Sequence, residues 1–365
     1  MNRINITGII QKYASKKFIW LLLIFILLII SSELVDAQES SLSKADVYVD
    51  NVPISTEYVL KDGYFLVPAL FFKEMGSYVD WNEEYDSIEF HLNNISFAHP
   101  TGSSVIDINT NNKWEREELS TPSIHVDGQT FVPLNDITKH LGLEVTYNEY
   151  LKKTFVKNPN VRNVRRIGSG DGTKNYIALT FDDGPDPLYT PQILDILKDK
   201  GVPATFFAIG EQVKKHPEIM QRIVKEGHAI GNHSFTHPEF PKIQSNEVRD
   251  EISNTQEVLS KTIGRKPDLF RPPYGALTRA DEEFLHQVGF QTIMWSVDTL
   301  DWTGLSGDKI FQIVVNQIEP GGIVLQHNID WNPDNLNGTV EALPRIIEEL
   351  QHQGYTFVTV QTLLD

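Results

Sequence analysis

The segment 180–185 reads TFDDGP and places Asp182 and Asp183 side by side. Adjacent ionised carboxylates repel each other, so a working site has to give the two groups different partners. A metal ion bound by one carboxylate would leave the other free to act as a base. Because Asp-Asp-Gly-Pro also suits an ordinary surface turn, this motif indicates chemistry only together with other polar motifs.

Two histidines four residues apart occur in the segment HSFTH at 233–237. Such a pair can face one metal ion if the backbone forms a helical turn. Pro238 disfavours the α region at His237, so we expect this turn to be short and to end there. Together with Asp183, His233 and His237 would supply three ligands on one face of a metal ion and leave positions open for water and substrate.

A further motif, RPPYG at 271–275, offers two groups that serve a catalytic site. The guanidinium of Arg271 can hold a carboxylate through two parallel hydrogen bonds. The prolines stiffen the loop, and the backbone N–H of Tyr274 can then point into the site as a donor to an oxyanion.

The segments DTLDW at 298–302 and LQH at 325–327 complete the set. A histidine such as His327 acts as a general acid when a nearby carboxylate orients it and raises its pKa. Asp298 and Asp301 both qualify as that carboxylate.

These motifs share a place in the predicted fold, because each follows the end of a short apolar strand. Strands alternate with amphipathic helical segments from residue 176 onward, which predicts parallel βα units. Parallel barrels carry their active sites at the carboxyl ends of their strands. We expect an α/β fold, a distorted, incomplete, seven-stranded (β/α) barrel. The predicted strands are Ile177–Phe181, Ala204–Ile209, Ala229–Gly231, Leu269–Phe270, Thr292–Val297, Ile323–Leu325 and Thr356–Val360, and the predicted helices include Pro191–Lys200, Gln212–Lys225, Ser245–Ile263 and Val340–Gln353.

With all five motifs present, residues 174–365 resemble the polysaccharide deacetylase family, the NodB-homology domain of carbohydrate esterase family 4. The resemblance implies that Asp182 is the catalytic base. It also implies that Asp183, His233 and His237 bind one divalent metal ion, with Zn²⁺ the first choice and Co²⁺, Mn²⁺ or Ni²⁺ as alternatives. No other cofactor is implied.

The same resemblance assigns the remaining site residues. Arg271 would orient Asp182, and Asp301, or alternatively Asp298, would support His327 as the general acid. Asn328 stands where family members often carry an acidic residue, and we expect little consequence from this difference. The groups predicted to contact the substrate are Tyr274, Trp302 and Leu325.

The chain before this region contains an internal repeat. Residues 65–68 (FLVP) and 130–133 (TFVP) each precede a short helical pattern that ends at Gly76 or Gly142, and two further strands follow. Residues 45–157 thereby resemble a copper amine oxidase-like N-terminal domain, which predicts a small two-repeat α+β domain without implying copper. Residues 158–173 are predicted to be a linker to the deacetylase domain at 174–365, and the N-terminal domain is expected to be dispensable for chemistry.

The N-terminus predicts export. Lys12, Lys16 and Lys17 precede the apolar run Phe18–Ile30, which is shorter than the roughly 20 residues of a membrane span. Residues 1–37 are interpreted as a signal peptide, with an uncleaved anchor as the alternative. Either reading places the rest of the chain outside the cytoplasm. We expect an extracellular protein, in the cell wall or at the outer face of the membrane of a Gram-positive-type bacterium.

Composition excludes several other classes of protein. The 365 residues include no cysteine, which rules out disulfides, thiolate catalysis and cysteine metal ligands. The net charge of −17 disfavours nucleic-acid binding. The resemblance to the polysaccharide deacetylase family implies a hydrolase that removes N-acetyl groups from peptidoglycan, at N-acetylglucosamine or N-acetylmuramic acid. We expect it to be a monomer whose N-terminal domain contacts the wall. The alternatives are a chitooligosaccharide deacetylase, an acetylxylan esterase, or a non-catalytic wall-binding protein.

Overall fold

The computed structural model describes residues 42–110, 113–160, 164–329, 331 and 336–365. Residues 45–365 form one compact unit. The predicted signal peptide at 1–37 lies outside the described residues. Across the described ranges, none of the helices has both the length and the apolar character needed to cross a bilayer.

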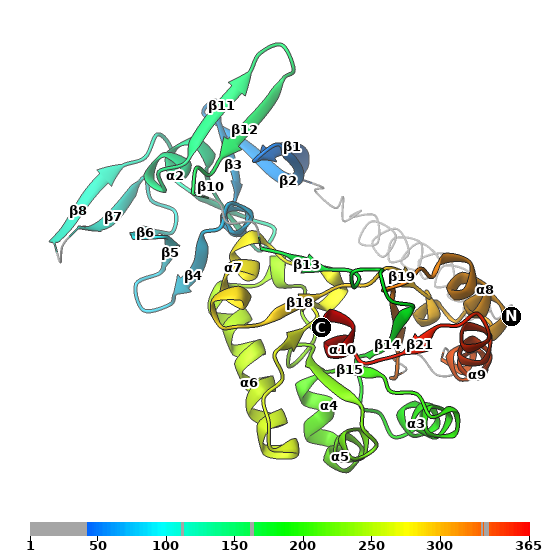
Figure 1. Cartoon of the computed structure of the whole chain (residues 1–365). Helices are drawn as coiled ribbons and strands as arrows, with labels where there is room; N and C mark the ends of the chain where they lie inside the picture. Colours follow the sequence, from blue (N-terminus) through cyan, green and yellow to red (C-terminus); the bar gives the residue numbers. More distant parts are fainter. Residues whose placement is uncertain (1–41, 111–112, 161–163, 330, 332–335) are drawn as a thin grey trace, which may run out of the picture. The chain divides into compact units, whose positions relative to one another are not determined.

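The first half of the compact unit is rich in β-structure. Its strands are β1 (Ser43–Val49), β2 (Val52–Lys61), β3 (Tyr64–Pro68), β4 (Tyr78–Asn82), β5 (Ser87–Leu92), β6 (Ile95–Pro100), β7 (Val105–Thr110), β8 (Lys113–Glu118), β9 (Ile124–Val126), β10 (Gln129–Pro133), β11 (Glu144–Asn148) and β12 (Lys153–Lys157). One sheet has the order β11-β12-β1-β2-β3-β10-β9 and the other the order β4-β5-β6-β7-β8, as Figure 1 shows in blue to green.

The two sequence repeats adopt similar local structures, a strand followed by a short helix, although the helix is 3₁₀ in the first repeat and α in the second. β3 leads into the 3₁₀ helix η1 (Ala69–Met75), and β10 leads into α2 (Leu134–His140). Gly76 and Gly142 follow these helices with φ of 91° and 69°, a left-handed conformation that favours glycine. The repeats meet where β3 and β10 pair in antiparallel register, with Val67 opposite Val132. The described residues of this part contain mainly strands, so it is more β-rich than the predicted α+β domain.

The second half forms the predicted incomplete barrel. Its strands are β13 (Arg166–Ile167), β14 (Tyr176–Asp182), β15 (Thr205–Ala208), β16 (Ala229–Asn232), β17 (Leu269–Phe270), β18 (Gln291–Ile293), β19 (Val297–Asp298), β20 (Ile323–His327) and β21 (Thr356–Phe357). The order is β13-β18-β17-β16-β15-β14-β20-β19, with β21 beside β14, so the sheet has nine strands where seven were predicted. One extra strand, β13, lies inside the predicted linker 158–173 and pairs with β18.

The other extra strand arises because the predicted strand Thr292–Val297 divides in two. β18 pairs with β17 on one side of the sheet, whereas β19 pairs with β20 at the opposite edge. Between them the backbone crosses from edge to edge: Met294 N–H donates to the carbonyl of Ile167, and Ser296 N–H donates to the carbonyl of Ile323. This kinked segment closes the barrel and lies directly beside the predicted active-site motifs.

Helices surround the strands of the barrel (Figure 1). Helix α6 has its predicted bounds, but the predicted helix Gln212–Lys225 is divided because Pro217 starts a new helix. The predicted last strand stops at Phe357 and is followed by a helix. The helices are α3 (Tyr189–Lys200), α4 (Gly210–Lys215), α5 (Pro217–Lys225), α6 (Ser245–Ile263), α7 (Arg279–Gln287), α8 (Gly307–Gln317), α9 (Asn337–His352) and α10 (Val360–Leu364), with 3₁₀ turns η2 (Phe240–Lys242), η3 (Pro273–Gly275) and η4 (Asp301–Thr303).

The central strand β14 explains how the barrel positions its polar groups. Side chains alternate between the two faces of a strand. Ile177, Leu179 and Phe181 belong to the apolar core shared with the surrounding helices, whereas Ala178 belongs to the cluster inside the barrel. Asp182 follows in the same alternation as Ala178, so its carboxylate lies on the inner face at the carboxyl end of the strand.

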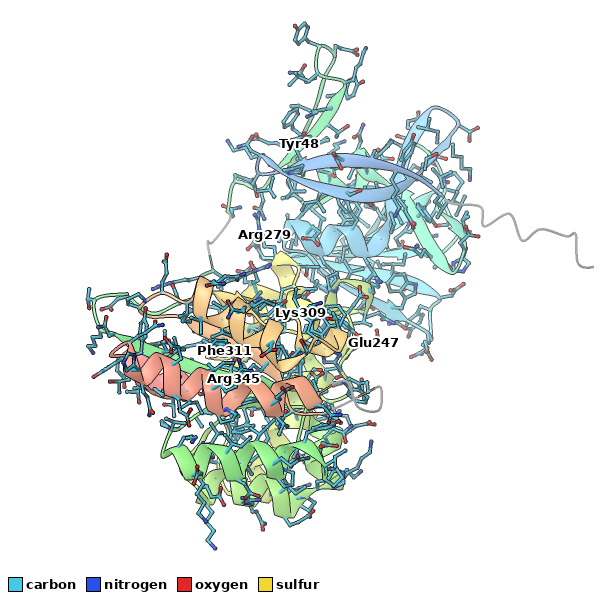
Figure 2. The ribbon with its side chains drawn as sticks, turned by 90° about the vertical axis from the view of Figure 1, so that its right-hand side faces the viewer. Tyr48, Glu247, Arg279, Lys309, Phe311 and Arg345 are labelled. Atoms are coloured by element: carbon cyan, nitrogen blue, oxygen red, sulfur yellow. The ribbon has the colours of Figure 1, made fainter. Side chains whose placement is uncertain are left out.

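Helices α8 and α9 cover this core on one side and are tied to each other at the surface. The guanidinium of Arg345 on α9 lies 4.7 Å from the ring centroid of Phe311 on α8, and both side chains are labelled in Figure 2. A cation over an aromatic face at this distance is attractive. The contact helps to hold the pair of helices that packs against β14 and β20.

Candidate active site

Asp183, His233 and His237 come together at the carboxyl ends of β14 and β16, and their ligand atoms lie within 4.8 Å of one another. Asp183 Oδ1 is 3.2 Å from His233 Nε2 and 3.4 Å from His237 Nε2. This oxygen is buried and has no hydrogen-bond partner. A buried carboxylate oxygen without a partner is unfavourable, so the three donors suit a shared cation. No second group of this kind occurs among the residues that the structure describes.

The ionisation of Asp183 and His237 also suits metal binding. Burial opposes the protonated form of His233, but the carboxylates of Asp182 and Asp183 outweigh burial and raise its pKa, so a metal ion would have to displace the proton on Nε2. His233 Nδ1 lies 2.7 Å from the carbonyl oxygen of Arg271. When Nδ1–H donates to that carbonyl, Nε2 presents a lone pair toward Asp183. Burial, aided by the charge of His233, lowers the pKa of His237 to about 4 and favours its neutral form. Burial opposes ionisation of Asp183, but the imidazoles of His233 and His327 outweigh burial and hold the pKa of Asp183 well below its usual value.

The loop that carries both histidines is irregular, so the predicted helical turn is wrong. Ser234 and His237 have φ of 64° and 67°, which breaks any helical path. Glu251 of α6 holds the loop instead, because its Oε2 accepts the backbone N–H groups of Phe235 and Thr236, both at 2.7 Å. Glu251 lies outside every motif, and sequence reasoning did not identify it.

Asp182 is hydrogen-bonded to Arg271, whose side chain is fully buried. Arg271 Nη1 donates to Asp182 Oδ1 at 2.7 Å and also to Thr180 Oγ1 at 2.8 Å. Nη2 donates to the carbonyl of Met294 at 3.0 Å. The predicted pair of parallel hydrogen bonds is therefore wrong, because the second nitrogen binds the backbone where the barrel closes. Asp182 Oδ2 remains directed toward the group formed by Asp183, His233 and His237, 3.8 Å from His233 Nε2.

His327 is held by Asp301 and not by Asp298. His327 Nδ1 lies 2.7 Å from Asp301 Oδ1. Asp301 Oδ2 accepts the backbone N–H of His327 at 2.9 Å and the hydroxyl of Thr339 at 2.8 Å. Asp298 instead accepts the backbone N–H of Leu300. Burial lowers the pKa of His327, but the carboxylate of Asp301 outweighs burial, and the pKa is raised to about 10.

These groups open onto one cavity of about 690 Å³, a size typical of sites for small ligands. Tyr274, Trp302 and Leu325, the residues predicted to contact substrate, line this cavity. Leu325 is buried, whereas Tyr274 and Trp302 are 66% and 56% exposed. Trp295 and Trp331 also line it and were not predicted. The cavity walls further include Asp182, Asp183, His233, His237, Asp298 and His327.

Left-handed backbone marks the same region. In the described part of the barrel, every non-glycine residue with positive φ belongs to one of the polar motifs: Asp183, Ser234, His237, Tyr274 and Leu300. Such conformations are unfavourable for residues with a Cβ atom, and they concentrate at functional sites. Tyr274, with φ of 58°, lies directly beside His237. The centroids of the two rings are 4.6 Å apart.

Both halves of the chain match known families. Residues 169–293 match the family model described as polysaccharide deacetylase, and residues 46–156 match that of the copper amine oxidase N-terminal domain. The chain is 43% identical over 195 residues to a peptidoglycan-N-acetylglucosamine deacetylase of Bacillus cereus. The aligned region covers 53% of this chain and 70% of that protein. The chain belongs to the polysaccharide deacetylase family.

Other members of this family are similar to the chain over different lengths. The peptidoglycan-N-acetylmuramic acid deacetylase PdaC of Bacillus subtilis is 36% identical over 230 residues, which is 63% of this chain and 47% of that protein. The solved structure of the Bc1960 peptidoglycan N-acetylglucosamine deacetylase has a TM-score of 0.53 at 42% identity and covers 55% of this chain and 92% of its own. These similarities confirm the barrel fold predicted for this polysaccharide deacetylase.

One similar structure limits what the fold alone implies. A CE4 family pseudoenzyme from Bacillus anthracis, BA3943, has a TM-score of 0.52 at 32% identity and covers 63% of this chain and 80% of its own. A shared fold alone therefore does not guarantee activity, so the geometry of the side chains in this chain matters as well.

Asn328 has a larger part in this deacetylase than its sequence position suggested. Its Oδ1 accepts the backbone N–H of Gly184 at 2.9 Å, its Nδ2 donates to Thr190 Oγ1 at 3.0 Å, and its backbone N–H donates to the carbonyl of Asp182. A Cβ atom on Gly184 would lie 2.3 Å from Asn328 Nδ2. Asn328 thus holds the turn that follows Asp182 and Asp183, and the expectation of little consequence from the Asn-for-acid difference stays a prediction.

Trp331 is a further site residue that the sequence did not reveal. Its Nε1–H donates to Asp183 Oδ2 at 3.0 Å. This bond occupies one carboxylate oxygen and leaves Oδ1 facing the two histidines. Trp331 lies beyond the last motif in a stretch without clear periodicity, so no pattern pointed to it.

Proposed function

We propose that this polysaccharide deacetylase is a metal-dependent hydrolase that removes N-acetyl groups from the amino sugars of peptidoglycan. One observation carries the proposal: two adjacent carboxylates have separate partners. Asp182 is hydrogen-bonded to Arg271, whereas Asp183 faces His233 and His237. Neighbouring carboxylates with such different surroundings are suited to different tasks.

A divalent metal ion fits the triad of Asp183, His233 and His237. One carboxylate and two imidazoles are ligands that Zn²⁺ accepts, and Co²⁺, Mn²⁺ and Ni²⁺ are the alternatives. When bound, such an ion supplies a Lewis acid that polarises the acetamide carbonyl and lowers the pKa of a water molecule. The buried Oδ1 of Asp183 supports this assignment, because it has no hydrogen-bond partner in the protein.

The remaining side chains are placed to move protons. Asp182 Oδ2 is directed toward the triad and is proposed to take the proton of the attacking water, while Arg271 keeps the carboxylate in place. The backbone N–H of Tyr274 is proposed to stabilise the oxyanion. His327 then donates a proton to the sugar nitrogen as the C–N bond breaks, which yields a free amine and acetate. Trp302 and Leu325 are proposed to flank the acetyl methyl group.

Replacing Asp301 with asparagine is expected to move the alkaline limb of the rate profile to lower pH. His327 donates a proton only while protonated, and its raised pKa of about 10 preserves that form until the pH rises through this value. A cation beside Asp183 opposes the imidazolium, so the limb of the metal-loaded enzyme lies below that pH. Loss of the Asp301 charge should lower the limb further, by about 1–3 pH units. The measurement is kcat against pH.

The matched control for this prediction is Asp298→Asn, since Asp298 lies in the same cavity but contacts Leu300 and not His327. Its alkaline limb should stay in place. An Asp301→Asn profile that overlays the wild type would contradict the assignment of His327 as the acid.

The choice of peptidoglycan rests on the relatives, which are named for its N-acetylglucosamine or N-acetylmuramic acid. The test is acetate release by the purified protein from peptidoglycan, chitin oligomers and acetylated xylan in parallel. We expect peptidoglycan to be the best substrate. Faster release from chitin oligomers or from xylan would instead establish a chitooligosaccharide deacetylase or an acetylxylan esterase.

A non-catalytic wall-binding protein is the second candidate, because one structural relative is a pseudoenzyme. The intact arrangement of Asp182, the metal triad and the His327–Asp301 pair argues against it. Binding to peptidoglycan without any acetate release would favour this candidate.

The location and partners of the protein are part of the same proposal. Peptidoglycan as substrate requires export, which agrees with the signal peptide predicted for residues 1–37. We propose a monomer in the cell wall or at the outer face of the membrane of a Gram-positive-type bacterium, with the N-terminal domain contacting the wall. Fractionation of cells followed by immunodetection tests this location.

A further inference from the structure

A buried lysine joins the N-terminal β-rich domain to the barrel. Lys73 lies in η1, and its side chain is 0% exposed. Its Nζ is 3.1 Å from Asp281 Oδ1 and donates to the carbonyls of Phe240 at 2.7 Å and Ile243 at 2.8 Å. An ammonium group has three N–H donors, and here three acceptors surround it.

Two of these acceptors belong to the segment that follows a metal ligand. Phe240 is the first residue of η2 and Ile243 directly follows it, and this turn lies between His237 and the start of α6. The η2 turn is short and offers few hydrogen bonds of its own, so an ammonium bound to both carbonyls restricts the path of the chain leaving His237.

The third acceptor belongs to the segment that follows the other active-site loop. Asp281 lies in the first turn of α7, where its Oδ2 accepts the backbone N–H and the hydroxyl of Thr278 at 3.0 and 2.6 Å. Helix α7 begins just after the loop 271–275, which carries Arg271 and Tyr274. Lys73 of the N-terminal domain therefore contacts the segments that follow two active-site loops, 233–237 and 271–275.

Further contacts join the N-terminal domain to the barrel, at the start of α6 and at the start of α7. Asp80 pairs with Arg249 at 3.0 Å. Arg279 of α7, labelled in Figure 2, pairs with Asp50. The backbone N–H groups of Val79 and Trp81 donate to Ser245 Oγ and Gln244 Oε1 at 3.0 and 2.6 Å.

We infer that Lys73 is a positioning residue for the metal triad, acting through the carbonyls of Phe240 and Ile243 on the segment behind His237. The inference rests on the proposed metal site. It also revises the expectation that the N-terminal domain is dispensable for chemistry, because that domain supplies this cation. Removing a group that does not bind the metal itself but orients a metal ligand typically weakens metal affinity by about 10–100-fold.

The alternative is that Lys73 only neutralises Asp281. Removing one partner of a buried ion pair leaves an uncompensated charge and destabilises the fold, whereas replacing both partners is often tolerated. The double variant Lys73→Met/Asp281→Asn separates the two roles. It removes both charges of the pair, and the asparagine oxygen can still accept from Thr278, but the carbonyls of Phe240 and Ile243 lose their donor.

The experiment compares the full-length wild type, Lys73→Met and the double variant. Zinc affinity is measured by competition with a chromophoric chelator, and thermal stability and amide hydrogen exchange at 238–244 are measured alongside. We expect the double variant to regain most of the wild-type Tm, yet to bind zinc about 10-fold more weakly and to exchange faster at 238–244. Arg249→Met is the matched control, because it breaks a different ion pair between the same domains and should keep its zinc affinity.

Three results would overturn the inference. In the first, the double variant regains zinc affinity together with stability, which reduces Lys73 to a partner of Asp281. In the second, Lys73→Met folds and binds zinc as the wild type does. The positioning role of Lys73 would then be wrong, and the assignment of the metal site would be unaffected. In the third, the wild type itself binds no zinc, and the metal assignment fails together with the inference. If Lys73→Met does not fold, the double variant decides the question.

Discussion

Replacing Asp182 with asparagine is expected to leave the metal content unchanged while turnover falls by about 10²–10⁴-fold, the usual effect of removing a general base. The asparagine oxygen can still accept the hydrogen bond from Arg271 Nη1, so the geometry around the base should survive. Metal content by elemental analysis and kcat on a soluble acetylated oligosaccharide check this prediction.

Asp183→Asn is the matched control, because it changes the neighbouring carboxylate in the same chemical way. It should weaken metal binding, since Asp183 Oδ1 faces both histidines, and excess metal should restore part of the rate. If Asp182→Asn lost its metal while Asp183→Asn kept it, the two roles would be reversed. If both variants remained fully active, the hydrolytic mechanism would have to be abandoned.

The double variant His233→Ala/His237→Ala is expected to lose the metal ion and all measurable activity. It removes two of the three donors that lie within 4.8 Å of one another, and a single carboxylate cannot hold a divalent ion tightly. Elemental analysis after dialysis checks the prediction. His286→Ala/His352→Ala is the control, because both of these histidines are exposed and lie outside the cavity. Full stoichiometric metal in the first double variant would refute the ligand assignment.

The sequence predicted the site well where local pattern and strand ends decide the outcome. Asp182 ends β14 and Asp183 follows it, and the alternation of the strand already places Asp182 on the inner face. His233 and His327 likewise come at strand ends, and parallel strands bring their carboxyl ends to one side of the barrel. The prediction of α6 was accurate because its apolar periodicity and its final glycine are both local signals.

The errors concern pairing partners, which periodicity cannot specify. An apolar stretch such as Thr292–Val297 indicates extended backbone but not that its two ends pair with opposite edges of the sheet. For the same reason the sequence predicts a linker at Arg166–Ile167, which pairs with β18, and predicts that Arg271 gives both nitrogens to one carboxylate, whereas Nη2 binds the carbonyl of Met294.

Residues that act across long sequence separations left no signal at all. Glu251, Trp331 and Lys73 belong to no motif, and each acquires its role only when the fold brings it to a distant loop. Lys73 looks like an ordinary helical lysine in the sequence, because nothing in the N-terminal domain predicts contact with the segment behind His237.

Acetate release from intact peptidoglycan, measured before zinc removal, after chelation and after zinc is restored, tests the account most directly. Mass spectrometry of the digested glycan strands would show whether the missing acetyl groups were on glucosamine or on muramic acid. We predict release by the wild type, loss on chelation, recovery with zinc, and almost no release by Asp182→Asn under any condition. Release that persists without metal, or that Asp182→Asn sustains at the wild-type rate, would contradict the account.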